Sequence, residues 1–156
     1  MNELMSVLAE KQRYCFNGKE KDFEGYIINN LSEIFNHVKI PAIKSIARQK
    51  AIQLQEVHPR NDIVVEHIDN TVSIIEVKSV NSRYPLQGRI EQAKAIGQLL
   101  YYESCFEVKH KVKPRLFLFD TKIYRNTYLV VLEHKLPISL VEIQNDRVLF
   151  LGRNLE

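Results

Sequence analysis

The segments Asp62-Ile-Val-Val-Glu-His67 and Val72-Ser-Ile-Ile-Glu-Val-Lys78 decide the fold of this chain. Both are rich in β-branched residues, which pack well on the pleated surface of a sheet. The Asp69-Asn70 pair between them is typical of a tight turn. The stretch therefore predicts two neighbouring antiparallel strands joined by a hairpin.

The second strand carries two charged residues that point the same way. Because side chains alternate along a strand, Glu76 and Lys78 share one face, and burying such a pair is costly unless it is used. Asp62 can stand opposite Glu76 only if the connecting turn holds an odd number of residues or a bulge. A plain two-residue Asp69-Asn70 turn would put Asp62 on the other face. The hypothesis of a shared site thus predicts a specific hairpin register.

Two carboxylates and an ammonium on one face indicate phosphate chemistry. Asp62 and Glu76 repel each other at short range unless a cation lies between them, and carboxylate oxygens suit Mg²⁺, for which Mn²⁺ can substitute. The backbone carbonyl of Val77 is a further candidate ligand. A divalent ion can activate water at a phosphate, and Lys78 can orient that water or neutralise the developing charge. Phosphodiester hydrolysis uses this set best. The alternative is a salt-bridge ladder on a strand surface, because an E-x-K triplet often arises by chance.

Hydrophobic periodicity in the rest of the chain predicts a mixed sheet between helices, which is an α/β arrangement. We expect helices over about 2–12, 19–37, 85–105 and 124–132. We expect further strands over 43–57 and 115–120, and a terminal hairpin of 138–143 with 148–151. The sequence has no repeat, low-complexity stretch or linker, so one domain spanning residues 1–156 is the simplest account.

The formal net charge of +3 is mildly basic, which is compatible with nucleic acid without requiring it. Lys109, Lys111, Lys113 and Arg115 alternate, so in an extended segment all four would share one face, either for phosphate contact or as a solvated strand edge. The two cysteines lie far apart and indicate neither a disulfide framework nor a cysteine metal cage. Residues 1–30 lack the apolar core of a signal peptide, and no apolar run is long enough to span a membrane. We therefore expect a cytoplasmic protein.

The order of these motifs resembles the P-D…(D/E)-x-K nucleases. Asp62 opens one strand and Ile75-Glu76-Val77-Lys78 ends the next, although Asn61 stands where the motif has proline. Upstream, Lys19-Glu-Lys-Asp-Phe-Glu24-Gly-Tyr-Ile27 resembles the helix that carries an extra glutamate in the RecB-like branch. Downstream, Gln98-Leu-Leu-Tyr-Tyr102 matches the Q-x-x-x-Y helix of that branch, and Ala93-Lys-Ala-Ile-Gly-Gln98 looks like the repair endonucleases related to NucS. The resemblance covers roughly residues 19–106, and the cysteines that hold an iron–sulfur cluster in some RecB-like nucleases are absent.

The resemblance implies a restriction-endonuclease-like fold, a mixed central sheet flanked by helices, and Mg²⁺-dependent cleavage of DNA. The sequence has no recognisable base-reading element, so we expect recognition of DNA structure or ends in repair, recombination or defence. By analogy we expect a homodimer, with no organic cofactor and no membrane contact. The alternatives are a nuclease that acts on RNA and a nuclease-fold module that binds or assembles without cutting.

The resemblance also assigns residues. The expected catalytic set is Asp62, Glu76, Lys78, Glu24 and Gln98, with Glu20 competing for the place of Glu24. The expected metal ligands are Asp62, Glu76, the Val77 carbonyl and Glu24. Phosphate contacts come mainly from Lys and Arg, so the expected nucleic-acid contacts, with Tyr102 beside the metal site, are Lys44, Arg48, Lys50, Lys109, Lys111, Lys113 and Arg115.

Overall fold

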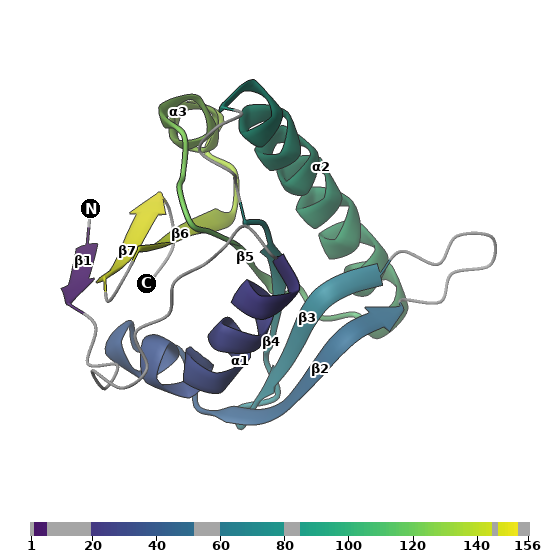
Figure 1. The fold of residues 1–156 in the computed structure, drawn as a ribbon. Helices are drawn as coiled ribbons and strands as arrows, with labels where there is room; N and C mark the ends of the chain where they lie inside the picture. Colours follow the sequence, from purple (N-terminus) through teal and green to yellow (C-terminus); the bar gives the residue numbers. More distant parts are fainter. Residues whose placement is uncertain (1, 6–19, 52–59, 80–84, 145–146, 153–156) are drawn as a thin grey trace.

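The computed structural model describes residues 2–5, 20–51, 60–79, 85–144 and 147–152, whose seven strands form one sheet (Figure 1). The elements follow the chain in the order β1 (Asn2–Met5), α1 (Glu20–His37), β2 (Ile43–Ala51), β3 (Arg60–His67), β4 (Val72–Val77), α2 (Pro85–His110), β5 (Arg115–Asp120), α3 (Arg125–Glu133), β6 (Ile138–Gln144) and β7 (Arg147–Gly152). The strands lie side by side in the order β1-β7-β6-β5-β4-β3-β2.

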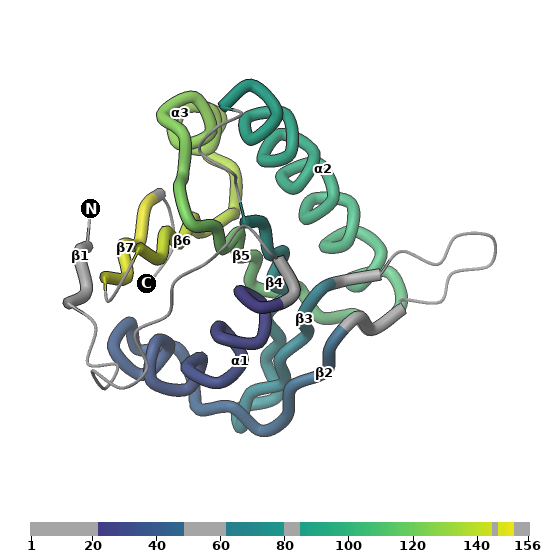
Figure 2. Tube along the Cα trace, viewed as in Figure 1, coloured from purple at the N-terminus to yellow at the C-terminus, as the bar shows by residue number. Residues whose placement is uncertain are grey.

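The sheet is mixed, as the sequence predicts. Strands β4, β5 and β6 pair in parallel, and the remaining neighbours pair antiparallel. Parallel neighbours need a crossover connection, which α2 supplies between β4 and β5 and α3 supplies between β5 and β6, as the chain trace in Figure 2 shows. The carboxyl ends of β4 and β5 therefore meet at one edge of the sheet.

Side-chain alternation divides the core into two layers. Ile63 and Ile75 belong to the buried cluster that includes the apolar residues of α1. Val64 and Ile74, one residue along each strand, belong to the cluster that includes the apolar residues of α2. Helices α1 and α2 thus cover opposite faces of the sheet, and the even-numbered residues of β3 and β4 face α2.

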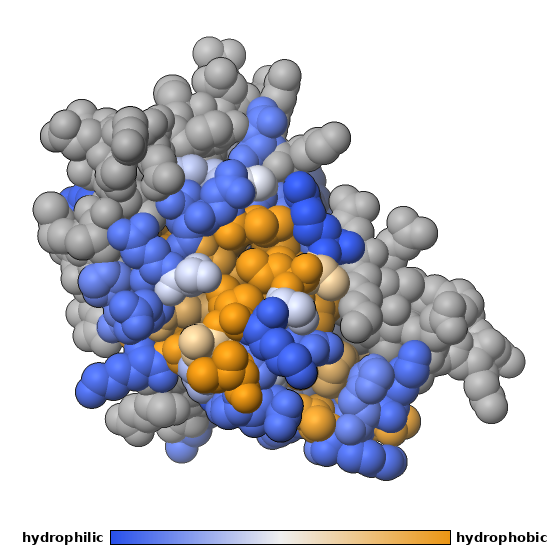
Figure 3. Space-filling model, turned by 90° about the horizontal axis from the view of Figure 1, so that it is seen from below, coloured by the Kyte–Doolittle hydropathy of each residue, from blue (hydrophilic) through white to orange (hydrophobic). Residues whose placement is uncertain are grey.

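The end of the sheet at the β3–β4 hairpin carries exposed apolar surface. In the view from below in Figure 3, hydrophobic residues gather at the centre of the face and hydrophilic residues surround them. At the hairpin tip, Ile68 has 66% of its surface exposed. This face lies at the opposite end of β4 from Glu76.

Most of the predicted elements are confirmed, and one is wrong. Helices α1, α2 and α3 and strands β2 to β7 lie where periodicity placed them, with α2 longer than expected at its C-terminal end. The helix expected over residues 2–12 is contradicted where it begins, because Asn2–Met5 is a strand that pairs with β7. Residues 6–12 of that helix and residues 52–57 of the strand expected over 43–57 lie outside the described ranges. Within those ranges, no helix is long and apolar enough to cross a bilayer.

The turn between β3 and β4 has an odd length. The last β3–β4 pair is Glu66 with Val72, so the five residues 67 to 71 lie between the paired positions, and the first of them, His67, still belongs to β3. Asn70 has a positive φ of 67°, and the Asp69 carboxylate accepts hydrogen bonds from the Thr71 amide at 3.0 Å and the Thr71 hydroxyl at 2.6 Å. Asparagine tolerates this left-handed conformation better than most residues, and the aspartate closes the turn on its own backbone. The register condition set by the sequence is therefore met.

His67 ties this turn to its surroundings. Its backbone amide donates to the Thr71 carbonyl at 2.9 Å, and its ring is fully buried. Because the Pro41 carbonyl, 2.7 Å from Nδ1, can only accept, Nδ1 carries the hydrogen. Nε2 then accepts from the Ser73 hydroxyl at 2.7 Å. Both ring nitrogens are satisfied in the neutral form, and burial lowers the pKa of His67.

Ser73→Ala removes the donor to His67 Nε2 and leaves a buried nitrogen without a partner. We expect the free energy of unfolding at neutral pH to fall by about 1–3 kcal/mol, measured by urea denaturation. Ser45→Ala, at an exposed position of β2, is the matched control and is expected to change it by less than about 0.5 kcal/mol. Equal losses in the two variants would contradict the role given to His67.

The same ring predicts a pH dependence. The folded pKa of His67 lies below its ordinary value of 6.5, so the unfolded chain takes up the proton first as the pH falls below that value. We therefore expect the free energy of unfolding to decrease as the pH falls below 6.5. In the His67→Gln variant, that part of the pH dependence disappears. A wild type and a variant with identical pH profiles would show that His67 is not the group responsible.

Candidate active site

The β3–β4 register brings Asp62 and Glu76 to the same face. Ile63 pairs with Ile75 and Val64 with Ile74, and one step further along the same register Asp62 stands opposite Glu76. Both residues have even numbers, so both lie on the face that α2 covers. The structure therefore places the two predicted ligands on neighbouring strands of one face.

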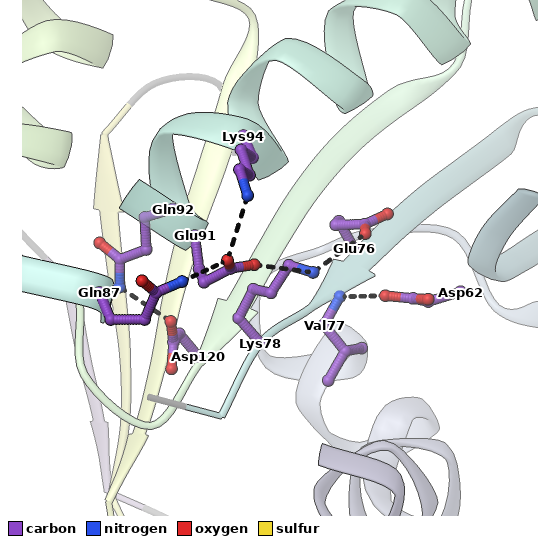
Figure 4. Close-up of polar contacts among 9 residues, drawn as sticks. All are labelled: Asp62, Glu76, Val77, Lys78, Gln87, Glu91, Gln92, Lys94 and Asp120. Atoms are coloured by element: carbon purple, nitrogen blue, oxygen red, sulfur yellow. Dashed lines mark hydrogen bonds and ion pairs between the residues drawn. The ribbon is translucent and has the colours of Figure 1, made fainter. Parts of the chain in front are cut away.

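Asp62 also holds the end of β4. Its Oδ2 atom accepts a hydrogen bond from the Val77 amide at 2.8 Å (Figure 4). The carboxylate thereby takes the place of a backbone acceptor at the point where the β3–β4 pairing ends. The ligand role of the Val77 carbonyl stays a prediction.

Lys78 lies against Glu76, as strand alternation predicts. Glu76 is 3% exposed, and its Oε1 atom lies 3.8 Å from Lys78 Nζ. The Lys78 amide donates to the Phe119 carbonyl of β5 at 2.9 Å, which fixes its backbone at the carboxyl edge of the parallel strands. The carboxylate and ammonium are thus positioned by two neighbouring strands rather than by a loop.

Helix α2 supplies Glu91, a second carboxylate partner for Lys78 that was not predicted from the sequence. Glu91 Oε2 lies 3.9 Å from Lys78 Nζ, and Glu91 Oε1 accepts from Gln87 at 2.8 Å and lies 3.5 Å from Lys94 Nζ (Figure 4). Lys78 therefore lies between one carboxylate of the sheet and one of the helix. The only sequence signal for Glu91 is its spacing from Gln87 and Lys94, which is common on exposed helices.

Tyr102 of the Q-x-x-x-Y stretch lies beside the two acids. Burial, followed by the negative charges of Glu76 and Asp62, raises the pKa of Tyr102 from the ordinary value of 10.0 to about 12. Gln98 is exposed, one helical turn from Tyr102 and two turns from Glu91. These three residues fall on one side of α2, which agrees with the shared face predicted for Gln98 and Tyr102.

Glu24 is not assembled with the other predicted ligands. It is buried on α1, and its Oε1 atom accepts from Arg48 Nε of β2 at 2.9 Å. Among the residues that the structure describes, no three His, Cys, Asp or Glu side chains form a group that could hold a metal ion. A metal centre on this face of the sheet would therefore depend on Asp62 and Glu76. The ligand role of Glu24 stays a prediction. The side chain of its competitor Glu20, the first residue of α1, lies outside the described part.

The prediction that the basic residues from Lys109 to Arg115 form one extended face is wrong. Lys109 belongs to α2, Lys111 has a φ of 56°, and Arg115 opens β5. The helix continues to His110 because its last turns still pack Cys105 and Phe106 into the core.

These cations also lie away from the two acids. Arg115 pairs with Ser73 and donates to Thr71 of the hairpin tip at 2.6 Å. Three residues of strand, about 10 Å, separate Ser73 from Glu76.

The other predicted phosphate contacts lie on β2. Lys44 is exposed beside the hairpin end, since its neighbour Ile43 pairs with His67. Arg48 pairs with Ile63, close to Asp62 in the chain, and its guanidinium contacts Glu24. The backbone of Lys50 belongs to β2, and its side chain lies outside the described residues.

Three cations outside the predicted set of phosphate contacts lie near the carboxyl ends of β4 and β5. Lys94 contacts Glu91 and is 63% exposed. Arg89 of α2 and Lys122 after β5 both lie over the ring of Tyr124, at 5.5 and 5.2 Å from its centroid. Arg89 and Lys122 are close in space because the crossover helix α2 begins at the edge where β5 ends.

A buried polar network fixes α2 at this edge. Gln92 donates to Asp120 of β5 at 2.8 Å and accepts from the Thr127 hydroxyl at 2.7 Å and the Tyr124 amide at 3.1 Å. Gln92 and Asp120 are fully buried. Since Gln92 follows Glu91 directly, this network sets the position of the helix residue that contacts Lys78.

Comparison with known proteins supports the fold. No family model matches the sequence, and no curated protein matches it. A repair endonuclease from Pyrococcus abyssi has a similar structure, with a TM-score of 0.54 and 13% identity. The match covers 85% of this chain and 50% of that one, so the chain spans about half the length of the neighbour. The likeness shows the fold, and the predicted α/β class with a restriction-endonuclease-like mixed sheet flanked by helices is confirmed.

We expect the metal-free protein to bind Mn²⁺ through Asp62 and Glu76, measured by isothermal titration calorimetry. Glu76→Gln and Asp62→Asn should each weaken binding by at least about 10- to 100-fold, the loss seen when residues supporting a ligand are changed. The asparagine retains an acceptor for the Val77 amide, so folding is preserved. Glu66→Gln, on the same face of β3 but at the hairpin end, should bind as the wild type does. Unchanged binding in the first two variants would place the ion elsewhere.

Proposed function

We propose that this protein is a Mg²⁺-dependent nuclease that hydrolyses DNA phosphodiester bonds. The observation that carries the proposal is the pair Asp62 and Glu76, opposite each other on one face, with the Lys78 ammonium 3.8 Å from Glu76. The fold, shared with a structure described as a repair endonuclease, supports it. The motif order supports placing the chain in the RecB-like branch, near the enzymes related to NucS.

The residues present fit a magnesium ion. Mg²⁺ is usually held by one or two carboxylates together with waters and substrate phosphate, so Asp62 and Glu76 suffice without Glu24. Their combined negative field, which contributes to the raised pKa of Tyr102, favours a cation there. The chemistry that such an ion supplies is activation of water and neutralisation of charge on the phosphate.

The side chains around the two acids have distinct roles in this proposal. Lys78 places a positive charge beside the reacting phosphate, where it stabilises charge that develops in the transition state. Tyr102, whose hydroxyl is protonated at neutral pH, can donate a hydrogen bond to a phosphate oxygen. Gln98, exposed on the same side of α2, is positioned to contact the substrate strand.

DNA is the proposed substrate, with cleavage directed by structure or ends. The protein with the similar structure is a repair endonuclease, and the motif resemblance points the same way. RNA cleavage is the competing function, and a homodimer is the proposed assembly for cutting both strands. Cleavage assays on linear, nicked, flapped and branched DNA and on matched RNA distinguish the two substrates.

Glu76→Gln and Lys78→Ala should each reduce the rate of Mg²⁺-dependent cleavage by about 100-fold or more, because each removes a group that acts on the reacting phosphate. The rate is measured with a labelled DNA panel, and circular dichroism at the assay temperature checks that the same variants are folded. Glu66→Gln is the matched control and should cut at the wild-type rate. Cleavage that persists unchanged in both active-site variants would reject the assignment, and cleavage of RNA alone would favour the competing function.

Two groups of cations compete for contact with the nucleic-acid backbone. Lys94 contacts Glu91, and Arg89 and Lys122 lie over Tyr124 just beyond the end of β5, whereas Lys109, Lys111 and Lys113 lie toward the hairpin end. A strand whose phosphate reaches Lys78 passes the first group, so we propose that this group makes the closer contacts.

The salt dependence of DNA binding tests this choice. Each phosphate contact contributes about 0.9 to the slope of log affinity against log salt for duplex DNA. Arg89→Ala with Lys122→Ala should therefore lower the slope by about 1.8, measured by fluorescence anisotropy in Ca²⁺. Lys109→Ala with Lys111→Ala should leave the slope nearly unchanged, and the reverse result would move the DNA path to the hairpin end.

A further inference from the structure

We infer that Glu91 is a positioning residue for Lys78, an inference that rests on the proposed function. Lys78 Nζ lies at nearly equal distances from two carboxylates, 3.8 Å from Glu76 and 3.9 Å from Glu91. Figure 4 shows the lysine reaching from the end of β4 into the space between them. Its side chain is only 15% exposed, so its ammonium depends on these partners for compensation of its charge.

The two carboxylates have different tasks. Glu76 is the proposed metal ligand, and a carboxylate that shares its charge with a divalent ion attracts a neighbouring ammonium less strongly. Glu91 comes from a different element and is outside the proposed ligand set. It therefore holds Lys78 in place both with and without the ion.

Glu91 is itself held in a fixed orientation. Its Oε1 atom accepts from Gln87, one turn earlier, and lies near Lys94, almost one turn later, which leaves Oε2 directed at Lys78. The next residue, Gln92, anchors the helix to Asp120 of β5. A lysine side chain has four rotatable bonds, and a partner that is fixed in this way restricts them.

A purely structural ion pair makes a different prediction. Glu91 is about one third exposed, and ion pairs at such positions contribute little to stability. If the pair were only structural, its loss would leave turnover unchanged. If Glu91 positions Lys78, turnover falls while substrate affinity and melting temperature are retained.

The test is Glu91→Gln, which keeps the shape and an acceptor for Gln87 but removes the charge. We expect kcat for Mg²⁺-dependent DNA cleavage to fall about 10- to 100-fold, the effect of misplacing a reacting group, with KM unchanged. Glu107→Gln, an exposed glutamate near the other end of α2, is the matched control and should keep the wild-type kcat. An unchanged kcat in Glu91→Gln, or a rise in KM without a fall in kcat, overturns the inference.

A second measurement needs neither metal nor substrate. The rate at which acetic anhydride modifies Lys78 in the metal-free protein, followed by mass spectrometry, should increase severalfold in Glu91→Gln and stay constant in Glu107→Gln. Equal modification in the two variants would show that Glu91 does not restrain Lys78. If the wild type cuts no nucleic acid, the proposed function fails, while this measurement still decides whether Glu91 restrains the lysine.

Discussion

The odd-length turn between β3 and β4 is the constraint on which the candidate site depends. A change of one residue in that turn would move Asp62 to the face covered by α1, away from Glu76. The turn is closed by side chain and backbone together, through Asp69 on Thr71 and through His67 on Pro41 and Ser73. The register at one end of the hairpin thus fixes which carboxylates meet at the other.

The site joins two layers of the fold. The sheet supplies Asp62, Glu76 and Lys78 near the carboxyl edge of the parallel strands, and α2 supplies Tyr102 and Glu91 from above that edge. A buried network centred on Gln92 fixes the helix relative to β5, so the two sets of side chains keep a constant separation. Few loop residues are involved, which suits chemistry that requires fixed distances.

From local alternation the sequence predicted the strands of the central hairpin, and from the parity of two residue numbers it predicted only which register a shared site would need. It failed for β1, because a four-residue edge strand owes its conformation to its distant partner β7. It failed for Lys109 to Arg115, because helical packing of α2 extends into a segment whose charge pattern resembles a strand. It missed Glu91, since only the docking of α2 on the sheet reveals that this glutamate faces Lys78.

The most direct test of this account is a crystal of the protein soaked in Mn²⁺, with diffraction data collected at the manganese absorption edge. An anomalous peak is expected between the carboxylates of Asp62 and Glu76, within coordination distance of oxygens of both. A peak elsewhere, or electron density with Asp62 turned to the α1 side of the sheet, would contradict it.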